Sequence, residues 1–123
     1  MKKKLTNIEV LTMMTVFDQL GVIPLPVKLS YAITKNKRLL VPEYEDCWDQ
    51  LKQFSKQFGE DSDEFLKAQN ELFNMMVEVD FYMVEFDIED LLNDETRILT
   101  SQQLEVLMLM ITHTEEIKEY TED

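Results

Sequence analysis

The feature that most restricts the fold is a long apolar stripe at helical spacing. Between residues 27 and 58, apolar side chains recur every three, four or seven positions, which is the pattern of one helix face. The stripe predicts helical structure over this whole stretch of the chain. It consists of Leu29, Ile33, Leu40, Tyr44, Trp48, Leu51, Phe54 and Phe58.

Pro42 interrupts this stripe. In a helix interior its ring clashes with the carbonyl of Arg38 and removes one hydrogen bond, at a cost of about 3 kcal/mol. Two arrangements are open: one long kinked helix, or two helices with Pro42 in the first turn of the second. We favour a break or a sharp kink, because the carboxylates that follow would suit the dipole of a new first turn. These carboxylates belong to Glu43, Glu45 and Asp46.

The chain before the stripe predicts one helix and a connector. Residues 6–9 (TNIE) match a capping box, which predicts a helix over about 7–20. Gly21 is expected to end it as a left-handed cap. The segment GVIPLP is not helical throughout, because Pro24 and Pro26 each lack a backbone donor. It is predicted to be an extended connector.

Two further helices follow the stripe. The turn GEDSDE, with Asp61 or Ser62 as N-cap, predicts an antiparallel hairpin and a helix over about 62–77. A second capping box at residues 100–103 (TSQQ) predicts a last helix over about 101–118. Its core, LEVLMLMI, is apolar on nearly every side, which indicates a central position or an interface.

Residues 77–86 (VEVDFYMVEF) change to a period of two with β-branched and aromatic residues, which predicts a strand. Its possible partners are residues 97–99, the connector at 22–25, or the same strand in a second copy of the chain. Residues 88–96 (IEDLLNDET) are predicted to form a loop or a short helical turn.

Together these elements predict a mainly α (α+β) fold. We expect a hairpin or bundle of four to five helices with a small β element near residues 77–86. The length suits a single domain over residues 1–123. Residues 1–5 and 119–123 are expected to fray.

Charge is divided unevenly along the chain. Residues 1–40 carry seven Lys or Arg against two acidic residues, a net charge of +5, whereas residues 41–123 carry five against 23, a net charge of −18. The total of −13 repels nucleic acid phosphates and attracts basic protein surfaces, so we expect no direct nucleic acid binding. There is no apolar run of about eighteen residues, so no membrane span is expected. The start MKKKLTNIEV lacks an apolar signal region, which favours a cytoplasmic protein.

No catalytic constellation stands out. His113 is the single histidine, which excludes a histidine pair for zinc and a Ser-His-Asp triad. Cys47 lies in the helical region without a nearby histidine and is interpreted as a core residue rather than a nucleophile. Two glycines are too few for a phosphate-binding loop. Residues 87–95 lack the glycine and the ligand spacing of a calcium loop, so we expect no metal, no cofactor and no enzyme.

The segment PLPVKLSYAITKNKRLLVPEYED resembles small proteins encoded by phages and prophages of Gram-positive bacteria, in which LP, YAI-KN and P-E recur in this order. VEVDFYMVEF and LTSQQLEVLMLMI are also similar to that family's acidic strand and final helix. The resemblance covers roughly residues 20–112. It implies a phage origin and a helical fold with a small β element, and it implies no catalytic residues.

These observations lead to the hypothesis of a non-enzymatic phage accessory protein that inhibits or modulates a host protein, including a defence system, in the host cytoplasm. Its acidic, Met-rich and aromatic surface would occupy a basic groove, such as one that normally holds nucleic acid. The alternative is a virion structural or assembly protein that self-associates, with a homodimer through the last helix or the strand. A third hypothesis is a small metal-dependent enzyme using Asp80, Glu85 and Asp87. The predicted partner-binding residues are Glu43, Glu45, Asp46, Asp49, Glu78, Asp80, Glu85, Asp87, Met108 and Met110.

Overall fold

The computed structural model describes residues 1–93 and 98–112. In this part of the chain it contains five helices and four short strands, which confirms the mainly α (α+β) prediction. The helices are α1 (Asn7–Leu20), α2 (Val27–Phe58), α3 (Asp63–Asn74), α4 (Ile88–Leu92) and α5 (Ser101–Leu109). The strands are β1 (Lys2–Thr6), β2 (Met76–Asp80), β3 (Val84–Glu85) and β4 (Ile111–Thr112).

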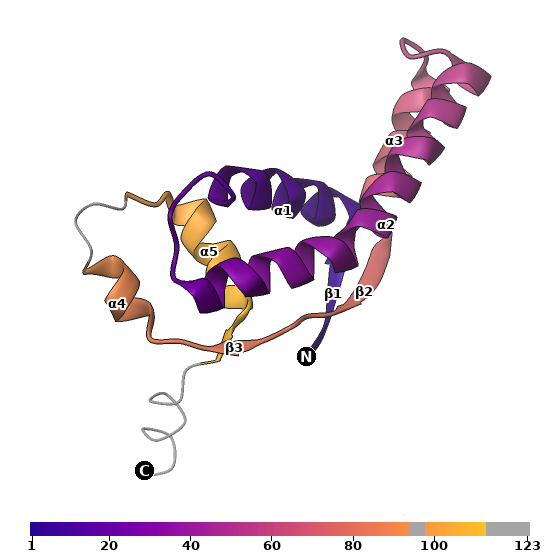
Figure 1. Cartoon of the computed structure of the whole chain (residues 1–123). Coiled ribbons are helices and arrows are strands. Elements are labelled where there is room, and N and C mark those ends of the chain that lie inside the picture. The colour runs from indigo at the N-terminus through magenta and orange to yellow at the C-terminus, as the bar shows by residue number, and fades with distance from the viewer. Residues whose placement is uncertain (94–97, 113–123) are drawn as a thin grey trace, which may run out of the picture.

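The molecule has a body and a projecting hairpin (Figure 1). In the body, α1, α5 and the first part of α2 surround the main core. The rest of α2 extends away from the body and runs antiparallel to α3. The main core is built around fully buried side chains that include Val10, Phe17, Leu29, Leu40 and Leu107. A second, smaller cluster of Cys47, Leu51 and Leu72 joins the two helices of the hairpin.

Local capping patterns set the helix starts as predicted. The Thr6 hydroxyl accepts the Glu9 N–H at 3.2 Å, and the Glu9 carboxylate accepts the Thr6 N–H at 3.0 Å. Thr100 and Gln103 form the same pair of bonds at the start of α5. Ser62 is the N-cap of α3 and accepts the Phe65 N–H at 3.1 Å. These bonds satisfy amides that lack partners within the helix.

The prediction of a left-handed cap at Gly21 is wrong. Gly21 has a φ of −63°, so it continues the right-handed backbone at the end of α1. Gly59, at the end of α2, has a φ of +82°, where other residues are strained. The connector that follows Gly21 is not helical, as predicted from its prolines.

At Pro42 the structure excludes the break, because α2 is a single helix that contains this proline, which leaves the alternative of one long kinked helix. Buried side chains lie on both sides of the proline, with Leu40 in the main core and Cys47 in the second cluster. The packing of α2 against α1 and α3 therefore outweighs the loss of one backbone hydrogen bond. The ribbon of α2 changes direction along its course between the body and the hairpin (Figure 1).

The predicted strand at 77–86 is divided between two small sheets. β2 pairs antiparallel with β1, in a register from Lys2 opposite Asp80 to Thr6 opposite Met76. β3 pairs parallel with β4, with Val84 opposite Ile111. The partners predicted within the chain, residues 97–99 and 22–25, are therefore wrong for both strands as far as the described residues go.

The pairing of β1 also overturns the prediction that residues 1–5 fray. Leu5 is buried in the main core, and the three lysines before it are paired with residues of β2 in the ladder. The other predicted frayed segment, 119–123, lies outside the described residues. The short-helix alternative for 88–96 is confirmed by α4 over its described part, since α4 begins at Ile88.

The last helix is shorter than predicted. α5 ends at Leu109, and the chain continues into β4, because Ile111 is buried and paired with Val84. The remainder of the predicted helix, from residue 113, lies outside the described residues. The apolar run of α5 is largely used by the core, and Met108 is its exposed large hydrophobic side chain.

Candidate partner-binding surface

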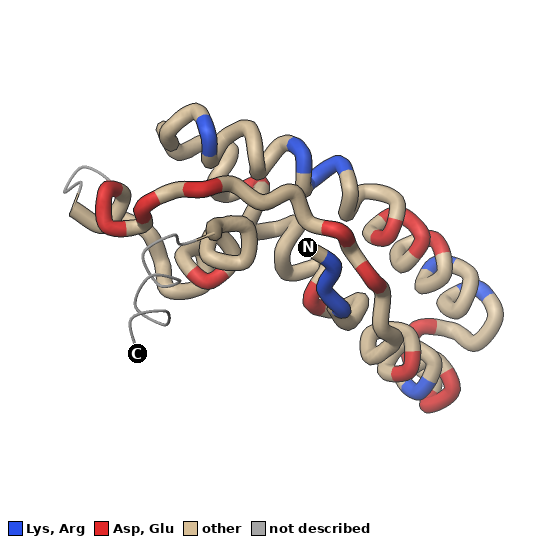
Figure 2. Tube along the Cα trace, turned by 90° about the horizontal axis from the view of Figure 1, so that it is seen from below, with Lys and Arg blue, Asp and Glu red and all other residues tan. Residues whose placement is uncertain are grey.

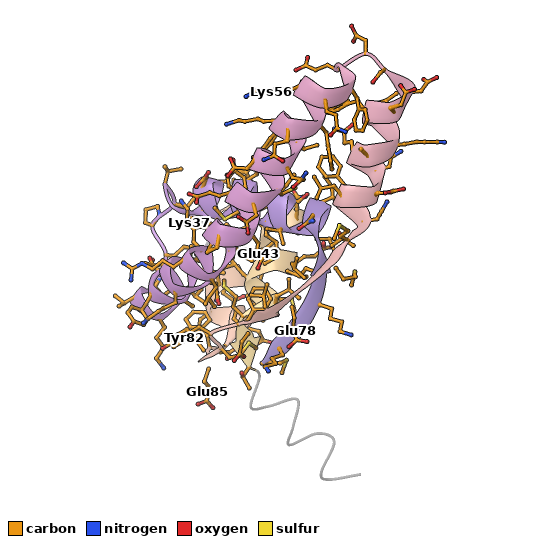
Figure 3. All side chains as sticks on the ribbon, turned by 90° about the vertical axis from the view of Figure 1, so that its right-hand side faces the viewer. Lys37, Glu43, Lys56, Glu78, Tyr82 and Glu85 are labelled. Carbon is orange, nitrogen blue, oxygen red and sulfur yellow. The ribbon has the colours of Figure 1, made fainter. Side chains whose placement is uncertain are left out.

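The predicted acidic partner-binding residues are spread over four elements rather than gathered in one patch. Figure 3 labels Glu43 on α2, Glu78 on β2 and Glu85 on β3, three different elements. In Figure 2, basic residues mark the first part of α2 and the N-terminal strand. Acidic residues mark the second part of α2, α3 and the segment from β2 to α4. The acidic residues therefore form several separate groups, one on each element.

The carboxylates near β2 and α4 already have partners within the chain. Asp80 accepts a hydrogen bond from the N-terminal ammonium group at 3.1 Å, and Glu78 lies 3.7 Å from the ammonium group of Lys2. Asp87 caps α4 by accepting the Glu89 N–H at 3.0 Å. The basic start of the chain thus offsets part of the acidic charge that the sequence assigns to this region.

The methionines of α5 do not both reach the surface. Met108 is 47% exposed, whereas Met110 is fully buried in the main core. The prediction that Met110 contacts a partner is therefore wrong, because the turn at the end of α5 directs this side chain inward.

The carboxylates of α2 differ from those of β2. Among the described residues, Glu43, Glu45, Asp46 and Asp49 take part in no ion pair. Glu45 and Asp49 are four positions apart, so they lie on one face of the helix at successive turns. Lys37 lies earlier on the same helix, and its ammonium group pairs with the carboxylate of Asp18 on α1 at 2.6 Å.

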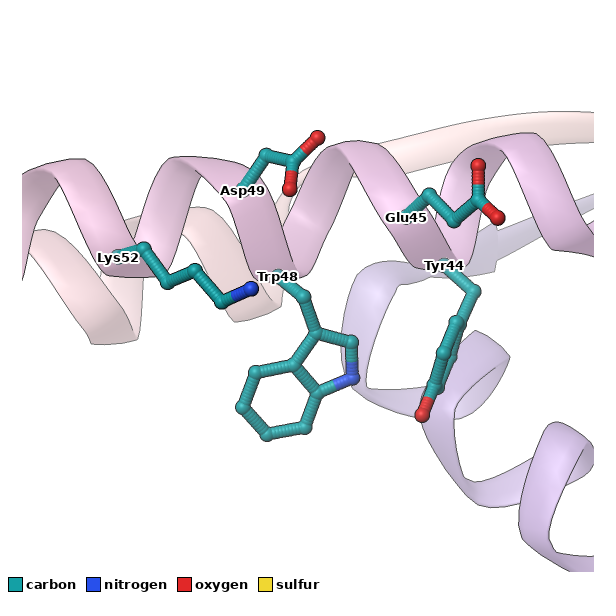
Figure 4. A pocket seen from close by; sticks show the side chains of 5 residues that line it. All are labelled: Tyr44, Glu45, Trp48, Asp49 and Lys52. Carbon is teal, nitrogen blue, oxygen red and sulfur yellow. The ribbon is translucent and has the colours of Figure 1, made fainter.

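The two exposed carboxylates border a surface hollow of about 610 Å³ on α2 (Figure 4). Its lining includes two aromatic rings, Tyr44 and Trp48, whose centroids are 6.3 Å apart and whose planes meet at 72°. This is the edge-to-face arrangement that aromatic pairs prefer. Trp48 is 42% exposed, a large apolar area for a free surface. We call the lining residues the Trp48 face: Tyr44, Glu45, Trp48, Asp49 and Lys52.

The packing of α2 explains why Trp48 is exposed. In this part of the helix, Cys47 and Leu51 are the residues that face α3 in the second cluster. Tyr44 packs against the main core near the base of the hairpin, whereas Trp48 lies one turn further out. The sequence prediction placed Tyr44 and Trp48 in the buried stripe. Cys47 lies outside the predicted stripe and yet packs against Leu72 together with Leu51, so the side of α2 that meets α3 is centred away from Trp48.

A second hollow, of about 370 Å³, lies between α2 and the segment around β3. Tyr31 and Tyr82 meet there edge to face, with ring centroids 5.6 Å apart. Lys35 places its ammonium group 5.4 Å from the centre of the Tyr31 ring. These aromatic side chains interact with each other and with a cation of the same chain, so the rings that line this hollow already have partners.

No group of His, Cys, Asp and Glu side chains in residues 1–93 and 98–112 is arranged to hold a metal ion. Cys47 is buried, as predicted, and burial raises the pKa of its thiol above the ordinary value, which keeps the thiol protonated. His113 lies outside the described residues. None of the described helices is both long enough and apolar enough to cross a membrane.

Comparison with known proteins leaves the family open. The chain matches no protein family, no curated protein and no solved structure.

Proposed function

We propose that this protein is a non-enzymatic binding protein whose Trp48 face contacts a basic surface of another protein. The observation that carries the proposal is a tryptophan that is 42% exposed beside two carboxylates without ion pairs. Tryptophan and tyrosine are enriched among the residues that dominate binding free energy at protein interfaces. Trp48 follows Cys47 of the second cluster, and its exposure leaves it accessible to a partner.

Charge and burial have separate roles in this proposal. The net charge of −13 attracts a basic partner over a distance and speeds the encounter, an effect that salt weakens. Contact with the rings of Tyr44 and Trp48 then supplies apolar burial at short range. The carboxylates would take positions that phosphates occupy on a nucleic-acid-binding protein, so binding would block that groove.

The resemblance to phage and prophage proteins suggests which partner to test. We propose a host protein in the host cytoplasm, including a component of a defence system, that this chain inhibits or modulates. The acidic residues lie on several elements, and those of β2 are paired with the start of the chain, which supports a contact centred on α2 rather than one spread over the whole acidic sequence.

The test is affinity purification from a host lysate, with partners identified by mass spectrometry. The tagged wild-type chain, the Trp48→Ala variant and the Leu66→Ala variant are compared at low and moderate salt. Leu66 is a matched control, because it is 51% exposed on the facing helix of the hairpin. We expect the same partner with the wild type and Leu66→Ala, its loss with Trp48→Ala, and weaker capture at moderate salt. Equal capture by all three proteins, or capture insensitive to salt, would contradict the proposal.

Light scattering coupled to size-exclusion chromatography tests the rival assembly role. A stable large oligomer would favour a virion protein that self-associates and would contradict the inhibitor proposal. A monomer or dimer would agree with a protein that works by binding a host partner.

A further inference from the structure

We infer that the hollow on the Trp48 face receives an arginine side chain of the basic partner. This inference rests on the proposed function and specifies the chemistry of the contact. It rests on three features of the Trp48 face: the aromatic pair, the two carboxylates and the position of Lys52.

The aromatic pair leaves a surface for a cation. Tyr44 and Trp48 meet edge to face, so the two rings do not cover each other's faces, and Trp48 remains 42% exposed. In Figure 4 both side chains project from the same side of α2. The face of an indole ring carries negative electrostatic potential and is the best aromatic acceptor for a cation.

The carboxylates and the indole ring favour an arginine in different ways. Glu45 and Asp49 repel each other at one helical turn, and no basic side chain of the described residues pairs with either. In Figure 4 their carboxylates project from the edge of α2 opposite to the rings, so they attract a cation to this part of the helix without touching a group stacked on Trp48. A guanidinium group can stack its plane on the exposed indole ring, whereas a lysine ammonium is more strongly hydrated and has no plane to stack.

Lys52 is the internal competitor. It lines the same hollow, and Figure 4 shows its side chain extending along α2 in the direction of Trp48. It forms no ion pair with Asp49, so its charge lowers the attraction for an incoming cation without neutralising a specific carboxylate. Removing this charge should strengthen arginine binding, an outcome that damage to the fold does not imitate.

Trp48 is the single tryptophan of the chain, so its fluorescence reports on this hollow alone. The probes are tetra-arginine amide and tetra-lysine amide, which carry equal charge, titrated at low salt. We expect tetra-arginine to change the Trp48 emission and to bind about threefold more tightly than tetra-lysine, as a cation–π contact at an exposed site implies. Lys52→Met should tighten the binding of both peptides by about two- to threefold.

Two variants separate a defined site from general charge attraction. Glu45→Gln/Asp49→Asn should weaken tetra-arginine about fivefold, since it removes the two charges that attract a cation to this part of the helix. Asp61→Asn/Glu64→Gln removes the same charge from exposed positions near the end of the hairpin and should have a smaller effect than the first variant. Trp48→Leu, followed by calorimetry, keeps an apolar side chain and should abolish the preference for arginine.

Equal affinity for the two peptides, or equal weakening by the two double variants, would overturn the arginine inference. Failure of this inference differs from failure of the proposed function. If Trp48→Ala loses the natural partner while arginine shows no advantage, the Trp48 face binds a partner by other chemistry. If the natural partner is kept by Trp48→Ala, the proposed function itself fails.

Discussion

The side chain of Asn36 forms two hydrogen bonds with the backbone of Tyr82. Its amide nitrogen donates to the Tyr82 carbonyl at 2.9 Å, and its carbonyl accepts the Tyr82 N–H at 2.7 Å. Asn36 is fully buried on α2, whereas Tyr82 lies in the segment between β2 and β3, outside any ladder. The Asn36 side chain therefore supplies the two hydrogen bonds that a neighbouring strand would otherwise make to Tyr82, at the point where the chain passes from one small sheet to the other.

Replacing Asn36 should destabilise the protein strongly. Asn36→Leu leaves a donor and an acceptor of Tyr82 without partners, and each such group costs about 1–3 kcal/mol when it is buried. We expect the free energy of unfolding to fall by about 2–5 kcal/mol in urea denaturation, with the larger values if both groups stay dry. Asn70→Leu is the control, because Asn70 is an exposed asparagine on α3. A loss below about 0.5 kcal/mol for Asn36→Leu would show that the pair does not hold this segment.

The start of the chain should contribute to stability through Leu5. This side chain is 6% exposed, so Leu5→Ala removes buried apolar groups and leaves a cavity, at a cost of about 2–5 kcal/mol. Val22 is 85% exposed, so Val22→Ala should change the free energy of unfolding by less than about 0.5 kcal/mol. Thermal and urea unfolding of both variants measure the difference. Equal stability of the two variants would restore the view that the first residues fray.

Cys47 should react slowly with a thiol reagent in the folded protein. Its side chain is buried, and burial raises the pKa of the thiol, so both access and the reactive thiolate are reduced. We expect the reaction with Ellman's reagent at pH 8 to be at least about a hundredfold slower than in urea-unfolded protein. A Trp48→Cys variant in a Cys47→Ala background supplies an exposed cysteine at the next position and should react fast. Equal rates for the two cysteines would contradict the buried position.

The same pKa shift predicts the direction of a pH effect on stability. The folded state holds the thiol proton more tightly than the unfolded state, so the unfolded state loses its proton first as pH rises. The contribution is fully present below the unfolded pKa and is lost as pH rises through the raised folded pKa. Stability should therefore fall in alkaline solution, and Cys47→Ala should show a smaller fall over the same range. Identical alkaline profiles for both proteins would contradict this assignment.

Local signals explain what was predictable from the sequence. Thr6, Ser62 and Thr100 each accept the amide three positions later, so a few adjacent residues were sufficient to predict three helix starts. The pairing of β1 with β2 joins residues that are far apart in the sequence, with three helices between them. The start KKKLT has one apolar residue for the core, which gives no alternating pattern from which to predict a strand.

The candidate surface was predictable only in part. The acidic charge of α2 was evident. The cationic partners of Asp80 and Glu78, which are the N-terminus and Lys2, are brought into place by the unpredicted strand β1. Helical periodicity assigned Trp48 to the apolar stripe of α2. Periodicity identifies an apolar face, but it does not show how much of that face the neighbouring helix covers. α3 is a single helix and covers only the row that contains Cys47 and Leu51.

Replacing Pro42 should stabilise the protein, because this proline lies in the interior of a continuous helix. Pro42→Ala restores an N–H that can donate to the carbonyl of Arg38 and removes the clash of the proline ring. We expect the free energy of unfolding to rise by about 1–3 kcal/mol, measured by urea denaturation. Gln53→Ala, at an exposed position on the same helix, controls for the helix propensity of alanine and should change it by less than about 0.5 kcal/mol. A fall in stability for Pro42→Ala would mean that the change of direction along α2 requires the proline, because the hairpin could then no longer pack Leu51 against Leu72.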